Sequence, residues 1–123
     1  MGLLRWVVLV LALPGASAAC GDGVTCTSEA RFGIVVTVRD SVTGNVVPGP
    51  VVVTARDGSY AETAGPPFSN GVDSFVLAVE RKGRYDVSVQ APDYRTWVRT
   101  GVQVTADECH VHTVQLQARL QKP

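Results

Sequence analysis

Short segments in which apolar and polar residues alternate recur along most of the sequence, separated by glycine, proline, asparagine and aspartate. Alternation with a period of two places apolar side chains on one face of a strand and polar side chains on the other. Segments of this kind occupy residues 33–39, 51–56, 59–64, 74–80, 84–90, 95–100 and 110–120. About seven short strands separated by turn residues, with no long helical pattern after residue 32, predict an all-β fold, an antiparallel β-sandwich.

The first twenty residues have the pattern of an export signal. Arg5 supplies a positive charge, residues 6–13 are almost all apolar, and small residues at 16–19 precede Cys20. The apolar run is roughly half of the ~20 residues that a membrane-spanning helix needs, so it does not predict a transmembrane anchor. A cysteine directly after the small residues resembles a bacterial lipoprotein signal, in which this cysteine is lipidated and becomes the first residue of the mature protein.

Two cleavage sites fit this region. Cleavage before Cys20 divides the chain into a signal peptide, a lipid-anchored tether and a β-sandwich domain, at residues 1–19, 20–32 and 33–120. Ser17, however, stands where lipoprotein signals usually have leucine, and residues 16–18 also form an ordinary Ala-x-Ala site for cleavage before Ala19. The first alternative predicts a lipid-anchored protein of the bacterial cell envelope, at the outer membrane or cell surface. The second predicts a periplasmic or secreted protein.

The charged residues are balanced, with 11 basic and 11 acidic side chains in the whole sequence. Removal of the signal takes Arg5 away and leaves the mature chain slightly acidic. No run of like charges is present that would attract nucleic acid or an anionic lipid surface. The sequence therefore predicts contact with the membrane through the lipid anchor, and no nucleic-acid partner.

Three cysteines are an odd number for an exported protein. If Cys20 carries lipid, Cys26 and Cys109 remain to form a disulfide in an oxidising compartment. Cys26 precedes the first predicted strand and Cys109 precedes the last, so a bridge between them closes a long loop if those strands are neighbours. The sequence has no Cys-x-x-Cys segment that would indicate a redox-active thiol.

Two stretches of the sequence resemble carboxypeptidase regulatory-like domains. Residues 34–51 contain a strand that ends at Asp40, an Asp-x-x-Thr-Gly turn and a Pro-Gly-Pro entry to the next strand. Residues 83–94 contain Gly-x-Tyr-x-Val-x-Val and then Ala-Pro-Asp-Tyr, in which Asp93 replaces the usual glycine. Aspartate tolerates the left-handed backbone conformation better than most residues, so we expect this turn to form. The resemblance covers residues 33–120 and implies a transthyretin-like sandwich that serves as an accessory or cell-surface module.

His110 and His112 are the two residues whose spacing suits a metal ion. Residues two apart in a strand point to the same face, so both imidazoles could reach one ion. Glu108 is the nearest carboxylate of the same parity, but it has no spacing that makes it an evident third ligand. The structural interpretation, which we favour, places His112 at the edge of the core with Val114 and Leu116, and leaves His110 solvated beside the disulfide.

Trp97 lies between Arg95 and Arg99 in the sixth predicted strand. If Thr96 and Val98 face the core, these three side chains all face the solvent. An exposed indole between two guanidinium groups can form a cation–π stack on the surface, or it can be a platform for a sugar or a partner protein. Surface packing and recognition are therefore the two alternatives for this face.

No arrangement for nucleophilic catalysis can be assembled from the sequence, which has no Gly-x-Ser-x-Gly segment. We therefore expect no enzyme activity and no cofactor. The expected role is binding or structural, in the cell envelope, with an envelope protein or a glycan as partner. The alternative is a metal-binding protein or metal-dependent enzyme that uses His110 and His112. The sequence indicates no oligomeric state.

Overall fold

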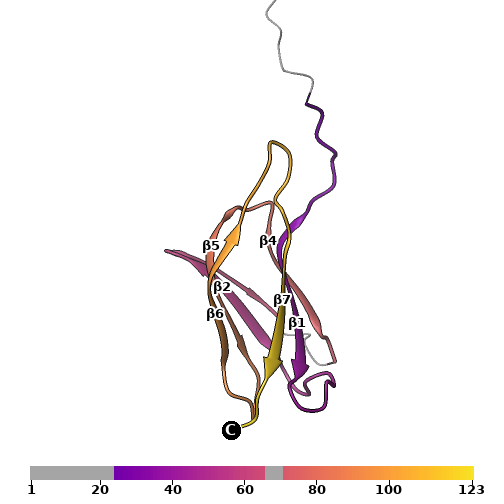
Figure 1. Ribbon diagram of the computed structural model, residues 1–123, viewed down its shortest axis with the longest axis vertical. Helices are drawn as coiled ribbons and strands as arrows, with labels where there is room; N and C mark the ends of the chain where they lie inside the picture. The colour runs from indigo at the N-terminus through magenta and orange to yellow at the C-terminus, as the bar shows by residue number, and fades with distance from the viewer. Residues whose placement is uncertain (1–23, 66–70) are drawn as a thin grey trace, which may run out of the picture.

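The computed structural model describes residues 24–65 and 71–123. The predicted signal peptide over residues 1–19 and the predicted lipidation site at Cys20 lie outside the described residues. The described chain forms seven strands, as an all-β sandwich requires (Figure 1). The described residues form no helix that is long and apolar enough to span a membrane. The strands are β1 (Phe32–Asp40), β2 (Val52–Asp57), β3 (Tyr60–Ala64), β4 (Ser74–Val79), β5 (Gly83–Gln90), β6 (Trp97–Val104) and β7 (Val114–Leu120).

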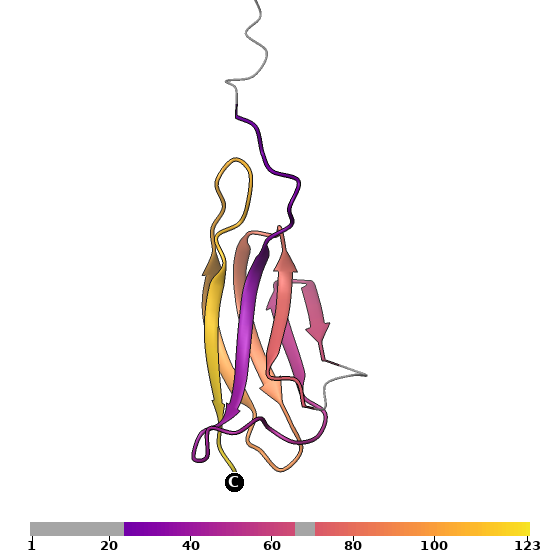
Figure 2. The ribbon, with the colours of Figure 1, turned by 90° about the vertical axis from the view of Figure 1, so that its right-hand side faces the viewer.

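The strands form two sheets that pack face to face (Figure 2). One sheet has the strand order β4-β1-β7 and the other has the order β3-β2-β5-β6. Neighbouring strands are antiparallel, except that β1 and β7 run parallel. The first and last strands are therefore neighbours, as the cysteine argument required. Strands β6 and β7 are edge strands of different sheets, and they contact each other across one open side of the sandwich.

The alternation in the sequence builds the core between the two sheets. Inward-facing positions of the strands carry side chains that are fully buried, among them Ile34, Val36, Leu77, Tyr85, Val87 and Val89. Each such apolar side chain stabilises the fold by about 1.5–3 kcal/mol through its removal from water. The hydroxyl group of the buried Tyr85 has a hydrogen-bond partner, because it donates to the Arg81 carbonyl oxygen at 2.8 Å. The predicted pattern of inward and outward faces therefore holds for the central strands.

The two ends of the sandwich carry different parts of the chain. The segment before β1 leaves the sandwich at one end, and the C-terminus lies at the other (Figures 1 and 2). The β1–β2 and β5–β6 connections also lie at the C-terminal end (Figures 1 and 2). The segment before β1 therefore enters the domain at the end opposite these two connections.

The start of the last strand differs from the sequence prediction. Strand β7 begins at Val114 rather than at residue 110. The chain before it is a loop closed by an isolated bridge between Ala106 and Val111. In this loop Val111 is buried and His112 is exposed, so the alternation of β7 does not extend back to the histidines. The expectation that His112 lies at the core edge in a strand is wrong.

Asp40 ends β1 and joins the two stretches that carry the family resemblance. Its carboxylate accepts hydrogen bonds from the backbone N–H groups of Val42 and Thr43, at 2.8 and 2.9 Å. It also accepts one from the Tyr94 hydroxyl at 2.7 Å. Asp93, the residue before this tyrosine, has a φ of 67°, so the left-handed conformation predicted there is confirmed. The bond from the Thr43 N–H, followed by that from the Tyr94 hydroxyl, lowers the pKa of Asp40 to about 2.

Asp40 should make the stability of the protein sensitive to acid. Its pKa falls from 3.8 to about 2 on folding, so its contribution to stability is present above pH 3.8 and is lost as the pH falls toward 2. We expect Asp40→Asn to lower the melting temperature at neutral pH. We also expect the melting temperature of this variant to fall less than that of the wild type as the pH is lowered toward 2. Thermal unfolding followed by circular dichroism, from neutral pH to about pH 2, measures both effects. An Asp40→Asn protein with the acid dependence of the wild type contradicts this assignment.

Candidate functional site

A groove opens where the start of β6 meets the end of β7. Its volume is about 330 Å³, which lies at the lower end of the range for small-molecule sites. The side chains that line this β6–β7 groove are Arg95, Thr96, Trp97, Val98, Arg119 and Gln121. The structure thus brings Arg95 and Trp97 of the predicted recognition surface together with Arg119 and Gln121, which sequence reasoning missed.

Trp97 faces inward, whereas the sequence led us to expect an exposed indole. The side chain is partly buried and packs against the core, and its neighbour across the sheet, Val89, is fully buried. Val98 instead faces the solvent, with 56% of its surface exposed. The predicted cation–π contact is nevertheless present, because the guanidinium carbon of Arg99 lies 5.3 Å from the centroid of the Trp97 ring.

A β-bulge in β6 explains why the predicted orientation is wrong. Tyr85 of β5 lies opposite Val102, but Val87 lies opposite Arg99, so β6 contains one extra residue in this interval. Gly101 lies in the bulge with a φ of 67°, a conformation that glycine adopts without steric cost. The extra residue reverses the alternation, so that Arg99 and Val102 lie on the same face of the strand. An uninterrupted period of two, which the prediction assumed, places them on opposite faces.

Arginine side chains make the groove positively charged. Arg95 and Arg119 line it, and Arg99 stands beside it against the indole. Within residues 24–65 and 71–123, none of these three arginines forms an ion pair, whereas Arg39 pairs with Asp73. Their guanidinium groups are therefore available to bind an anionic group.

The backbone ties the two sides of the groove together. The Arg95 N–H donates a hydrogen bond of 2.8 Å to the carbonyl oxygen of Gln121. This bond joins the segment before β6 to the segment after β7. Arg119 projects outward from β7, as the alternation in the sequence indicates, but its position next to Trp97 follows only from the meeting of two edge strands.

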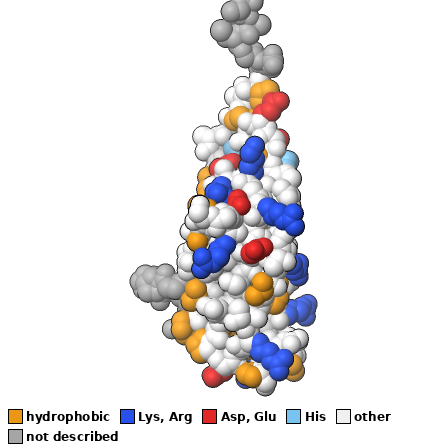
Figure 3. Space-filling model, turned by 90° about the vertical axis from the view of Figure 1, so that its left-hand side faces the viewer, with side chains coloured by type: hydrophobic (Ala, Val, Ile, Leu, Met, Phe, Trp, Pro, Cys, Tyr) orange, Lys and Arg blue, Asp and Glu red, His pale blue; other side chains and the backbone are white. Residues whose placement is uncertain are grey.

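Other charged side chains are distributed over the outer face of the four-stranded sheet rather than gathered in one patch. Figure 3 shows blue Lys and Arg side chains scattered over this face, with red acidic side chains between some of them. Arg56 of β2 and Asp86 of β5, for example, lie directly opposite each other in the sheet. The β6–β7 groove is thus distinguished by an indole next to arginines, and not by positive charge alone.

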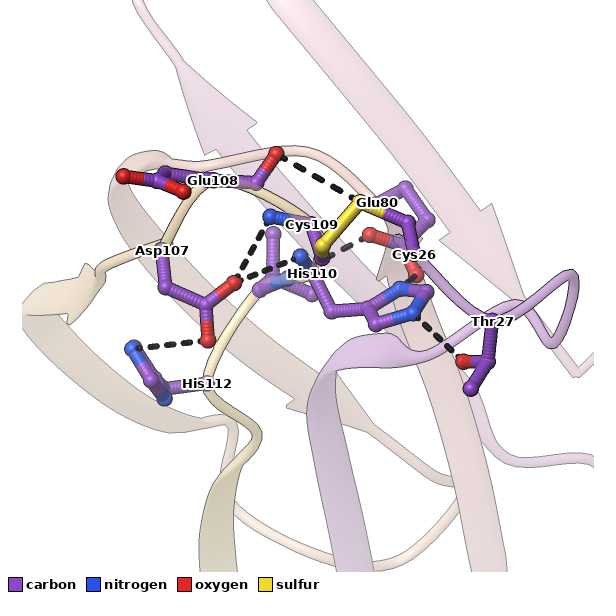
Figure 4. The surroundings of a disulfide bond; sticks show 9 residues. Cys26, Thr27, Glu80, Asp107, Glu108, Cys109, His110 and His112 are labelled. Atoms are coloured by element: carbon purple, nitrogen blue, oxygen red, sulfur yellow. Dashed lines mark hydrogen bonds and ion pairs between the residues drawn. A yellow bond between two sulfur atoms is a disulfide. The ribbon is translucent and has the colours of Figure 1, made fainter. Parts of the chain in front are cut away.

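The predicted cysteine pair lies at the other end of the sandwich. Cys26 and Cys109 are at disulfide distance, with their Cα atoms 5.1 Å apart and a separation of 83 positions in the sequence (Figure 4). The bridge joins the segment before β1 to the loop before β7. It therefore fixes the segment before β1 to the body of the domain.

His110 lies beside this disulfide and uses both ring nitrogens. Its Nδ1 is 2.7 Å from Oε1 of Glu80, and its Nε2 is 2.8 Å from the Thr27 hydroxyl (Figure 4). Because a carboxylate only accepts hydrogen bonds, Nδ1 is the donor to Glu80. The bond from His110, together with one from the backbone N–H of Arg31, lowers the pKa of Glu80. With 11% of its side chain exposed, His110 is not the solvated residue that we expected.

His112 points away from His110 and toward Asp107 (Figure 4). Its Nε2 lies 3.9 Å from Oδ2 of Asp107, and 58% of its side chain is exposed. Backbone N–H groups of His110 and Cys109 hold the Asp107 carboxylate and lower its pKa. In the described part of the chain, no three histidine, cysteine or acidic side chains are grouped so as to hold a metal ion. The strand geometry that would direct both imidazoles to one ion is not formed.

The two clusters therefore have different chemistry. The histidine cluster comprises His110, Glu80 and Thr27, together with the backbone N–H of Arg31. These groups hydrogen-bond one another and so connect three segments of the chain, which suits a structural role. The β6–β7 groove combines an aromatic surface with guanidinium groups that have no ionic partner in the described residues. Comparison of the sequence with known protein families and with curated proteins found no match.

Proposed function

We propose that the chain is an exported lipoprotein of the cell envelope and that its β-sandwich is a non-catalytic binding module. The export pattern of residues 1–19, followed by Cys20 as the lipidated residue, supports the first part. A seven-stranded sandwich is compatible with the resemblance to carboxypeptidase regulatory-like domains, which implies a transthyretin-like accessory module. The β6–β7 groove is then the recognition surface, with an envelope protein or a glycan as its partner.

The placement of the groove relative to the tether is the observation that carries this proposal. The tether leaves the domain at the end where the disulfide lies, while the groove lies near the C-terminus at the opposite end (Figure 1). A lipid on Cys20 would hold the tether end of the domain close to the membrane. The groove would then point away from the lipid surface and toward partners in the envelope.

The groups that line the groove suit binding better than catalysis. Arg95 and Arg119 line the groove with guanidinium groups, which bind anions through charge and paired hydrogen bonds and are poor acid–base catalysts. The hydroxyl of Thr96 and the amide of Gln121 are neutral hydrogen-bonding groups. An indole among such groups offers a flat apolar surface with a polar rim, the usual composition of a ligand site.

Substitution of the indole tests the binding role. With Cys20→Ser in every protein, so that no lipid contributes to retention, we expect Trp97→Leu, which keeps an apolar side chain against the core, to reduce retention of the mature chain on its native envelope material at least about tenfold, a loss of about 1.4 kcal/mol. Phe32→Leu is the matched control, because Phe32 is also a partly exposed aromatic residue but lies at the tether end. Co-sedimentation with envelope fragments measures retention, and thermal unfolding checks that both variants fold. Equal retention of folded Trp97→Leu and wild-type protein contradicts the proposal.

A further inference from the structure

We propose that the β6–β7 groove binds a sugar that carries a carboxylate group, as in an acidic polysaccharide of the envelope. This inference rests on the proposed function and adds the class of ligand to it. Three features of the groove lead to it. They are the partly buried indole, the arginines without ionic partners in the described residues, and the strand edge beside them, where the Arg95 N–H is already hydrogen-bonded to the Gln121 carbonyl oxygen.

The indole suits the apolar face of a sugar ring. Trp97 packs against the core on one side and lines the groove on another, so its ring is held in place before a ligand arrives. Arg99, at 5.3 Å from the ring centroid, further restricts the ring. A rigid aromatic surface costs little conformational entropy on binding, because its side chain is already ordered in the free protein.

The charged and polar groups suit the substituents of an acidic sugar. Arg95 and Arg119 line the groove, and a guanidinium group can bind a carboxylate through two parallel hydrogen bonds. Thr96 and Gln121 add a hydroxyl and an amide, which can both donate to and accept from sugar hydroxyls. No aspartate or glutamate is among the residues that line this groove, so a carboxylate ligand meets no like charge in its wall.

The backbone around the groove does not suit a peptide that adds to the sheet as an extra strand. Strand addition requires a regular edge with free N–H and carbonyl groups. Here the Arg95 N–H is already bound to the Gln121 carbonyl oxygen, and the bulge at Gly101 interrupts the edge of β6. Bulges of this kind protect edge strands from pairing with another chain. A compact ligand that is recognised by side chains therefore fits the groove better than an extended peptide.

Titration of the mature protein with defined oligosaccharides tests the inference. The probe is an oligosaccharide of galacturonic acid, and the control ligand is the neutral galactose oligosaccharide of the same length, both followed by isothermal titration calorimetry. We expect the acidic probe to bind at least tenfold more tightly than the neutral one, with an affinity that decreases as salt is added. The double variant Arg95→Gln/Arg119→Gln should lose at least tenfold in affinity for the acidic probe.

The matched control variant is Arg56→Gln/Arg84→Gln, which removes the same charge from exposed positions outside the groove. It should bind the acidic probe as the wild type does. Equal affinity for the acidic and neutral probes, an equal loss in both double variants, or no binding of the acidic probe each overturns the inference. If the envelope still retains the wild type better than Trp97→Leu in any of these cases, the proposed binding function stands and only the ligand class is wrong.

Discussion

Replacement of both Cys26 and Cys109 by alanine is expected to lower the free energy of unfolding by about 4 kcal/mol. The bridge spans 83 residues of sequence, so it removes a large part of the conformational freedom of the unfolded chain. Neither cysteine belongs to the buried core, and therefore the substitution leaves the packing between the sheets unchanged. Urea denaturation of the mature protein, followed by circular dichroism, measures the change.

Reduction provides the control for this prediction. A reducing agent should lower the stability of the wild type by the same amount and should leave the double alanine variant unaffected. The slope of the unfolding free energy against urea concentration should also increase, because the unfolded chain without the bridge exposes more surface. If the double alanine variant loses less than about 1 kcal/mol of unfolding free energy, closure of the long loop by the disulfide does not stabilise the protein to the expected extent.

Gly33→Ala is expected to lower the free energy of unfolding by about 1–3 kcal/mol, the usual cost of overpacking a core. A Cβ atom on Gly33 would lie 2.7 Å from the carbonyl oxygen of Ala78, closer than real Cβ atoms approach other atoms. It would also lie 3.1 Å from Val104 Cγ1, on the facing sheet. Ala78 cannot move freely, because its N–H donates to the Glu62 carboxylate at 2.7 Å.

The control for Gly33→Ala is a substitution on the exposed side of the same sheet. Gln117→Ala changes a side chain of β7 that faces the solvent, and we expect it to change the stability by no more than about 0.5 kcal/mol. Thermal and urea unfolding of both variants measure the difference. If Gly33→Ala is as stable as the wild type, Ala78 and Val104 do not approach this glycine as closely as the structure indicates.

Much of the fold follows from local sequence pattern. In β5, and in β1 from Ile34 to Asp40, the buried residues alternate with the others, and both strands lie within a residue of the predicted ranges. The turn at Asp93 also formed as predicted, because a single short polar residue decides its backbone conformation. Local physics of this kind acts between residues that are close in sequence, so a pattern of period two is sufficient to predict it.

The candidate site depends on contacts that local pattern does not contain. One extra residue at Gly101 reverses the face of Trp97, and a sequence pattern with a constant period cannot include such a change. Arg119 reaches the groove because two edge strands from different sheets meet. Glu80, the partner of His110, follows β4 and is brought to it by the loop that precedes β7. Each of these contacts is set by tertiary structure.

The intact mass of the mature protein, isolated from its native membrane and measured before and after reduction, tests the proposed lipoprotein most directly. We predict a chain that begins at Cys20, carries the mass of the attached lipid and gains the mass of two hydrogen atoms when the bridge between Cys26 and Cys109 is reduced. A chain without lipid that begins at Ala19 contradicts the lipid anchor, and with it the orientation of the groove away from the membrane. A lipidated chain that gains no mass on reduction contradicts the disulfide.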